Sequence, residues 1–289
     1  MIHIICDTTA CLNDEFVARH DNLHMIPLYI SLGGGETVND NSISTKEVFE
    51  SYEATKIQPL TSQPSIGEWM QIFNSIPEED PIIIITISKI VSGTAQTARV
   101  AAKQSKRKQI AVIDSHSTNG GMQILVEEAL AMIAEGKDFD TIVAQLHENI
   151  ANSITMFVPT DLKYLQRGGR IGKVASLVGS ILQIRPILYL ESDAIGILDK
   201  VRTTKRAMQK MKEKAMSRPI KRLHVATVLA DELGRQFKRE LESELPDVTI
   251  THSEGSPVLG AHLGPQVVSL MLEWEHEDGT EEDTHVQWN

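Results

Sequence analysis

Serine, threonine, arginine and histidine side chains that could bind an anion recur in short segments along the whole sequence. Ser92, Gly93 and Thr94 begin a helical pattern, in which a serine can cap the helix and a glycine lets a ligand approach the backbone. Free backbone N–H groups and the helix dipole would attract an anion there. A capped helix without a ligand explains the same residues, so this segment alone leaves both interpretations open.

A second hydroxyl-rich segment contains Thr61, Ser62 and Ser65. Ser65 and Glu68 have the spacing of a capping box, in which each side chain bonds the other's backbone N–H at the start of a helix. This spacing explains Ser65 and Glu68 structurally, and it leaves Thr61 and Ser62 as candidate donors to an anion. Hydroxyls in loops often bond only their own backbone, so both roles stay open for Thr61 and Ser62.

Two glycine-rich segments contain the remaining candidates. Residues 167–173 lack the G-x-x-x-x-G-K-[ST] spacing of a nucleotide-binding loop and follow a helical segment instead of a strand. Their glycines are expected to break a helix while Arg170 projects toward an anion. Residues 255–265 are predicted to form a loop, and its His262 is either structural or part of a site.

Signatures of metal-dependent or nucleophilic catalysis are missing from the sequence. His20 and His24 have H-x-x-x-H spacing, but the glutamate of H-E-x-x-H is absent and no further ligand is assignable. There is no G-x-S-x-G motif, and no His–Asp pair can be assigned to Ser92. The sequence therefore predicts no metal and no cofactor. A serine-dependent acyl hydrolase or transferase using Ser92 remains the enzymatic alternative.

Charge limits the classes of partner. The 289 residues include 28 Lys and Arg against 39 Asp and Glu, a net charge of −11, which argues against nonspecific nucleic-acid binding and broad attraction to anionic membranes. One basic stretch interrupts this acidity and is either a solvated helix face or a docking patch for an acidic partner. It consists of Arg202, Lys205, Arg206, Lys210, Lys212 and Lys214.

The two cysteines, Cys6 and Cys11, cannot form a disulfide framework. No basic segment followed by a long apolar run opens the chain, and no apolar run approaches the length of a transmembrane helix. We therefore expect a cytoplasmic protein.

The elements that must position these residues begin with an α/β pattern. Apolar runs at residues 2–6, 81–87 and 109–114 alternate with helical patterns at residues 92–103 and 121–134, and residues 25–39 look like a hairpin around three glycines. This alternation predicts a parallel sheet with helices on both sides. In such sheets ligands bind at the carboxyl ends of the strands, where residues 7–9, 88–94 and 114–115 should meet.

The pattern changes after about residue 158. Residues 161–185 are helical with glycine breaks and precede an antiparallel pair at 186–190 and 194–199. Helices are expected at 203–217 and 231–241, and strands at 222–229 and 248–252. The sequence therefore predicts two α/β domains, residues 1–158 and residues 159–289, the second with a mixed or antiparallel sheet. The acidic tail from Glu273 onward is expected to be solvated or partly disordered.

Taken together, these segments resemble the DegV family of bacterial fatty-acid-binding proteins, whose FakB members serve a fatty acid kinase. The matching segments occur in the family's order and span nearly the whole chain. They are DTTA at residues 7–10, TSQPS at 61–65, SGT at 92–94, DS at 114–115, LQRGGR at 165–170, IRPIL at 184–188 and GAHLGP at 260–265.

The resemblance implies a long-chain fatty acid buried between two α/β domains, its carboxylate held by Thr61, Ser62, Ser92, Gly93, Arg170 and His262. It also implies a binding subunit and not an enzyme, because a separate ATP-dependent kinase phosphorylates the bound carboxylate to an acyl-phosphate used in phospholipid synthesis. Arg202, with Lys205 and Arg206, would contact that kinase. Transient membrane contact is compatible with this role.

The physical chemistry of the predicted ligand agrees with this implication. Burying a carboxylate is costly unless it is paired and hydrogen-bonded, which hydroxyls, a helix N-terminus and Arg170 would achieve. Each buried CH₂ of the acyl chain contributes about 0.8 kcal/mol. Another anionic metabolite, such as a phosphate ester, remains an alternative ligand. Residues near Ile26, Ile90, Leu182 and Ile187 are guesses for the tunnel lining.

Overall fold

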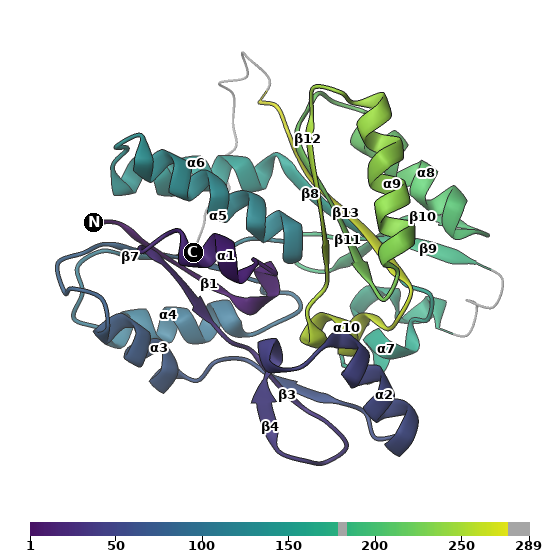
Figure 1. Cartoon of the computed structure of the whole chain (residues 1–289), viewed down its shortest axis with the longest axis horizontal. Coiled ribbons are helices and arrows are strands. Elements are labelled where there is room, and N and C mark those ends of the chain that lie inside the picture. The colour runs from purple at the N-terminus through teal and green to yellow at the C-terminus, as the bar shows by residue number, and fades with distance from the viewer. Residues whose placement is uncertain (179–183, 277–289) are drawn as a thin grey trace.

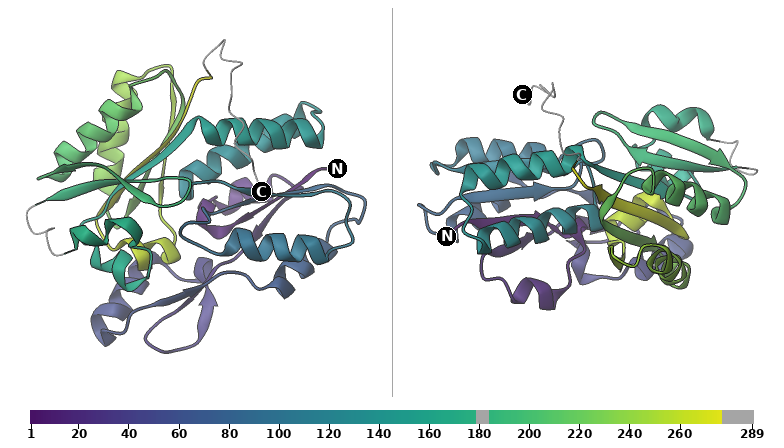
Figure 2. Two further views of the ribbon diagram at one scale, coloured as in Figure 1. Left: turned by 180° about the vertical axis from the view of Figure 1, so that it is seen from behind. Right: turned by 90° about the horizontal axis from the view of Figure 1, so that it is seen from above.

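Two β-sheets lie side by side in the computed structural model, which describes residues 1–178 and 184–276 (Figures 1 and 2). The first sheet is parallel and has the order β2-β1-β6-β7. Its strands are β1 (His3–Asp7), β2 (Leu23–Ile26), β6 (Ile82–Thr86) and β7 (Ile110–Asp114). We call this half of the molecule, with its helices, the N-terminal lobe.

Successive side chains along each strand of this sheet point to opposite faces, and helices cover both faces. Ile83 and Ile85 pack toward α5 (Asn119–Ala134) and α6 (Phe139–Ala151). Ile82 and Ile84 pack toward α3 (Ile66–Asn74) and α4 (Thr94–Gln104). Because both faces are buried, β6 is apolar at four successive positions, as expected for a central parallel strand. The predicted parallel sheet flanked by helices is confirmed.

The second sheet is mixed and has the order β10-β9-β8-β13-β11-β12; only β11 and β12 run parallel. Its strands are β8 (Ser153–Val158), β9 (Arg185–Leu190), β10 (Ile195–Val201), β11 (Ile220–Val228), β12 (Thr249–Glu254) and β13 (Val267–Trp274). Helices α8 (Thr204–Ala215) and α9 (Asp231–Glu244) cover one face through a large apolar core. The other face turns toward the N-terminal lobe.

A third, small sheet and short helices occupy one end of the molecule. The sheet has the order β4-β3-β5, from β3 (Tyr29–Ser31), β4 (Thr37–Asn39) and β5 (Leu60–Ser62). Figure 1 shows α10 (Pro257–Leu263) beside α7 (Lys163–Arg167) and α2 (Thr45–Thr55), at the lower end of the six-stranded sheet. The remaining short helices are α1 (Asp14–Ala18) and the 3₁₀ turns Thr8–Ala10, Asp40–Ser42 and Gly172–Leu177.

Several sequence predictions need correction. The apolar run at residues 25–32 is not one strand, because Pro27 separates β2 in the parallel sheet from β3 in the small sheet. The predicted loop at 255–265 contains helix α10, which Ser256 caps through the backbone N–H of Leu259. The tail was expected to be solvated from Glu273, but Glu273 is 1% exposed within β13; residues 277–289 lie outside the described ranges.

The predicted domain boundary at residue 158 stays a prediction. The strand pairing adds one fact to it, because β8 pairs with β13 and β9 and so belongs to the six-stranded sheet. The second sheet therefore begins before the predicted boundary, at Ser153. No helix within residues 1–178 and 184–276 combines the length and apolar character that crossing a bilayer requires.

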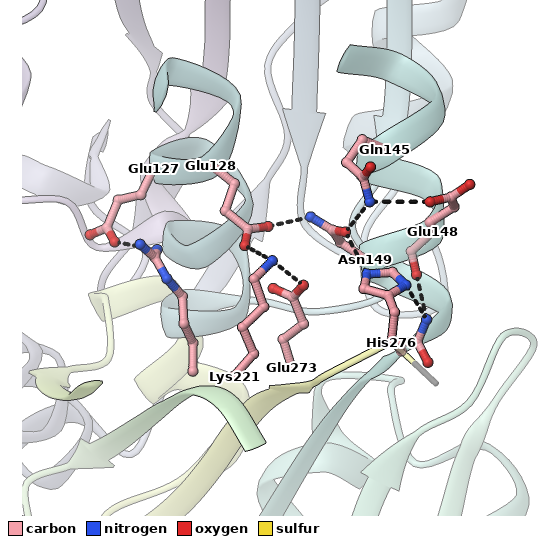
Figure 3. A network of polar contacts seen from close by, with 10 residues as sticks. Glu127, Glu128, Gln145, Glu148, Asn149, Lys221, Glu273 and His276 are labelled. Carbon is pink, nitrogen blue, oxygen red and sulfur yellow. Dashed lines mark hydrogen bonds and ion pairs between the residues drawn. The ribbon is translucent and has the colours of Figure 1, made fainter. Parts of the chain in front are cut away.

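A polar network joins the two lobes at the end of the sheet away from α10 (Figure 3). The Lys221 ammonium on β11 lies 2.8 Å from the Glu273 carboxylate on β13 and 2.5 Å from that of Glu128 on α5. Asn149 on α6 also donates to Glu128. Burial, followed by the nearby charge of Glu128, raises the pKa of Glu273 to about 7, so in the folded protein this carboxyl keeps its proton to a higher pH than an ordinary glutamate does.

The stability of the protein should therefore depend on pH through Glu273. An unfolded glutamate titrates at its ordinary pKa of about 4.3, so between about pH 4.5 and 7 the folded state binds more protons than the unfolded state. Stability then falls as the pH rises through this window. Glu273→Gln should flatten that fall, measured as the change in Tm between pH 5 and pH 8.

Glu275→Gln, two residues along the chain at an exposed position, is the matched control and should follow the wild-type pH profile. An unaltered pH profile in E273Q would contradict the assignment.

Candidate functional site

A cavity of about 290 Å³ lies between the two lobes. Its walls come from the loop after β6, from β5, from α10, and from the face of the six-stranded sheet that α8 and α9 leave uncovered. Its apolar lining includes Val91, Phe157, Leu165, Leu190, Leu259 and Met271. The volume is near the lower end of the range for small-molecule sites, and a mostly apolar wall with few polar groups is the usual design of such sites.

The polar side chains at one end of this cavity are those that the sequence predicted. Thr61, Ser62, Ser92, Arg170 and His262 all line it. They come from β5, from the loop before α4, from the loop after α7 and from α10, which are far apart in sequence. The tertiary structure therefore brings together five of the six predicted ligand-binding residues. The sixth, Gly93, lies beside them.

Thr61 and His262 form the central contact of this polar group, with Thr61 Oγ1 and His262 Nε2 2.7 Å apart. Burial, and then the nearby charge of Arg170, lowers the pKa of His262 to about 4. The imidazole is therefore neutral at physiological pH. It serves as a hydrogen-bonding group that fixes Thr61, and it adds no charge to the site.

Gly168 provides the space for His262. A Cβ atom at position 168 would lie 2.1 Å from His262 Nδ1, which is closer than any side chain can tolerate. The backbone there is ordinary, with φ near −73°, so the need for glycine comes mainly from the imidazole, and a Cβ would also lie 3.2 Å from the carbonyl oxygen of Tyr164. Part of the glycine-rich segment thus exists to let α10 place its histidine against α7.

Arg170 connects this segment to the loop before α4. Its Nε donates to the carbonyl oxygen of Val91 at 3.0 Å, and its Nη1 donates to that of Gly168 at 2.5 Å. Within the described residues, Arg170 is the only lysine or arginine lining the cavity. These two bonds hold the guanidinium beside the polar end and leave further N–H donors for an anion.

Ser92 and Gly93 occupy the loop before α4, in an arrangement that differs from the expected one. The helix begins at Thr94 with Gly93 as its N-cap, so Ser92 is not the cap. The Ser92 hydroxyl lies 2.8 Å from that of Thr94. A Cβ at position 93 would lie 2.3 Å from the Gln63 side chain. Gly93 thus lets β5 and its following residues approach the loop closely.

Gln63 also lines the cavity, and sequence reasoning did not select it. Its place inside the TSQPS segment was the available signal. The capping box of Ser65 and Glu68 is confirmed, with both reciprocal bonds present. Residues near Ile26, Ile90, Leu182 and Ile187 were expected in the tunnel lining. Leu28, Val91 and Leu190 do line the cavity, whereas Ile26, Ile90 and Ile187 themselves do not, and Leu182 lies outside the described residues. Ile187 packs toward α8 and α9, on the opposite face of the sheet.

Other predicted segments hold the strand ends together instead of lining the cavity. The Asp7 carboxylate accepts from the backbone N–H of Ile87 at 2.8 Å, and that of Asp114 accepts from Lys89 N–H at 3.1 Å. The expected meeting of these loops at one sheet edge is confirmed. Arg202, Lys205 and Arg206 are exposed at the start of α8 and lie outside the cavity.

This arrangement suits the binding of a singly charged anion that carries an apolar chain. One guanidinium and several hydroxyls match a carboxylate, whereas a doubly charged phosphate ester would lack a second cation. Nucleophilic catalysis needs a base within hydrogen-bond reach of the nucleophile. His262 bonds Thr61 and Ser92 bonds Thr94, so among the described residues Ser92 has no such base.

Comparisons with known proteins find relatives that match nearly the whole chain. The family model described as "Uncharacterised protein, DegV family" matches residues 1–275. A "DegV domain-containing protein" of Halalkalibacterium halodurans is 32% identical over 283 residues, covering 93% of this chain and 97% of the relative.

Two solved structures share the fold. A protein from Bacillus subtilis, described as DegV, a fatty acid binding protein, is 26% identical with a TM-score of 0.85, covering 95% of this chain and 99% of its own. A Streptococcus pneumoniae protein, described as a fatty acid kinase B3 protein loaded with linoleic acid, has a TM-score of 0.83. It is 20% identical and covers 95% of this chain and all of its own, so its likeness concerns the fold alone.

Proposed function

The chain belongs to the DegV family, and from this membership we propose that it binds a long-chain fatty acid in the cavity between its lobes. The carboxylate lies among Thr61, Ser62, Ser92, Arg170 and His262, and the acyl chain extends along the apolar wall. The observation that carries the proposal is the convergence of these side chains, from four separate segments, at one end of an apolar cavity. The binding of a fatty acid by the Bacillus subtilis relative supports it.

The energies favour tight binding. An acyl chain of sixteen carbons would contribute roughly 12 kcal/mol from buried CH₂ groups before the costs of association are subtracted. The carboxylate must leave water, and that cost is offset when charged and neutral donors satisfy both of its oxygens. A ligand held in this way should remain bound through purification.

The test is to purify the protein under native conditions, denature it, and identify the extracted lipids by mass spectrometry. We expect roughly one equivalent of long-chain fatty acid per chain. A Ser92→Ala variant should retain less, because it removes one donor to the carboxylate. Finding no fatty acid, together with no uptake of added palmitate or oleate, would refute the proposal.

We further propose that this protein does not act on its ligand and instead presents the carboxylate to a separate ATP-dependent fatty acid kinase. The description of the Streptococcus pneumoniae structure as part of a fatty acid kinase supports this role. The exposed residues Arg202, Lys205 and Arg206 form the contact surface, since basic side chains on an acidic protein favour a specific, acidic partner.

Arg202→Glu tests the kinase contact. With a fatty acid kinase catalytic subunit and ATP, this variant should form acyl-phosphate at less than a tenth of the wild-type rate, because the substitution places repulsion at the interface. Its affinity for fatty acid should not change. Arg239→Glu, at an exposed position on α9, is the control and should behave like wild type. Equal rates for both variants would exclude this surface.

A further inference from the structure

The end of the cavity away from Arg170 is also polar. Three side chains there carry hydroxyl groups: Thr118, Thr155 and Ser269, and Asn119 adds an amide. Hydroxyl and amide groups beside the end of a saturated acyl chain would gain no hydrogen bond from the ligand. Apolar side chains at the same positions would pack against the chain without the cost of burying oxygen atoms. Thr155 and Asn119 bond other side chains of the protein, so the hydroxyls of Thr118 and Ser269 are the groups that need an explanation.

The strand register shows how deep this polar group lies. At one end of the sheet β8 ends and β13 begins. There the Thr160 hydroxyl donates to the carbonyl oxygen of Pro265 at 2.8 Å and joins the residues that follow β8 to those that precede β13. Thr155 pairs with Met271, three residues before the end of β8 and four residues after the start of β13. At about 3.3 Å per residue this pair lies roughly 10 Å further along the sheet than the end that carries α7 and α10. Ser269 pairs with Phe157 and lies two residues nearer that end.

The first turn of α5 closes this inner end. A Cβ at Gly120 would lie 2.0 Å from the ring of His224, and a Cβ at Gly121 would lie 1.9 Å from Ser117 Oγ. Ser117 Oγ in turn is 2.6 Å from Thr155 Oγ1. The two glycines therefore let the N-terminus of a 16-residue helix press directly against the sheet, beside the Thr155–Met271 pair.

Thr118 is the N-cap residue of this helix, but its side chain makes no capping bond. Its hydroxyl oxygen is buried and has no hydrogen-bond partner within the described residues, while Thr155 and Asn119 have theirs. An unpaired buried hydroxyl costs about 1–3 kcal/mol. Thr118 lines the cavity beside the N-terminus of α5, where the helix dipole favours an electron-rich ligand atom.

We propose that the inner end of the cavity binds an uncharged oxygen on the acyl chain, so that the preferred ligand is an oxygenated fatty acid such as a hydroxy fatty acid. Thr118 and Ser269 bond that oxygen from opposite lobes. This inference rests on the proposed function. The oxygen is uncharged because, within the described residues, no lysine or arginine other than Arg170 lines the cavity, and Arg170 serves the carboxylate.

The experiment compares fatty acids of 8 to 18 carbons with their terminally hydroxylated analogues by isothermal titration calorimetry on delipidated protein. At the best chain length, the hydroxylated ligand should bind about five- to tenfold more tightly than its parent, as expected for one satisfied hydrogen bond. The corresponding dicarboxylic acid should bind more weakly than the parent, since its second charge has no cation to meet.

Thr118→Val has nearly the same shape without the hydroxyl and should abolish the preference, so that the hydroxylated ligand and its parent bind equally. Ser269→Ala should reduce the preference in the same direction. Thr249→Val, on the exposed edge of β12, is the matched control and should retain it.

The outcomes separate this inference from the proposed function. Binding of the parent fatty acid without any preference for the hydroxylated analogue, in wild type and in T118V alike, overturns the inference alone. Failure of every fatty acid to bind overturns both. Tighter binding of the dicarboxylic acid overturns the assignment of an uncharged oxygen.

Discussion

Replacing Arg170 with alanine is expected to weaken fatty acid binding about 10- to 100-fold. Arg170 is the only lysine or arginine lining the cavity within residues 1–178 and 184–276, and the neighbouring His262 is neutral. A hydrogen bond to a charged group contributes about 1.5–3 kcal/mol, which corresponds to this range of affinity. The dissociation constant for oleate, measured by calorimetry on delipidated protein, is the direct check.

One further variant separates charge from geometry at this position. Arg170→Lys keeps the positive charge but cannot reproduce the planar fork that reaches both Val91 and the ligand, so its affinity should be intermediate. Arg167→Ala is the control, because Arg167 lies in the same segment and contacts the Tyr52 hydroxyl at an exposed position. If R170A bound oleate like R167A, the carboxylate would have to lie elsewhere.

The second large effect is expected from Gly168→Ala. The added methyl group would overlap His262 Nδ1, so the imidazole would have to move and its contact with Thr61 would break. Because both groups line the polar end of the cavity, we expect at least about a tenfold loss of affinity, with some loss of stability from the steric strain. Measurements of Tm and of the dissociation constant together distinguish these two effects.

A double-mutant cycle makes this prediction specific. In a His262→Ala background the imidazole is gone and only the carbonyl oxygen of Tyr164 remains close, at 3.2 Å, so Gly168→Ala should then cost much less. Gly67→Ala is the matched control in the wild-type background, since a Cβ there would meet only Ser65 Oγ at an ordinary 3.8 Å. Equal losses from G168A in both backgrounds would show that the glycine acts by another route.

Much of the first lobe could be predicted from the sequence because its determinants are local. The run from Ile82 to Ile85 is apolar at every position, which indicates a strand buried on both faces, and it is the central β6. The capping box of Ser65 and Glu68 correctly located the start of α3. These features depend on residues one to four positions apart.

The second lobe was harder to predict because its strands depend on partners far away in the chain. Strands β8 and β13 were not predicted, and they pair with each other across more than 100 residues. The segment that contains His262 has glycines and prolines that suggested a loop, yet packing against α2 and α7 makes it a helix. Tertiary contacts there override local preference.

The groups that could bind a carboxylate can be identified from residue type alone: the hydroxyls of Thr61, Ser62 and Ser92, the guanidinium of Arg170 and the imidazole of His262. Their chemistry is a property of the side chains and needs no fold. Folding is what leaves His262 neutral through burial and the charge of Arg170, makes glycine necessary at position 168, and brings Thr118 and Asn119 to the cavity wall. Burial, close approach and the direction of a cavity arise from segments that meet only after folding.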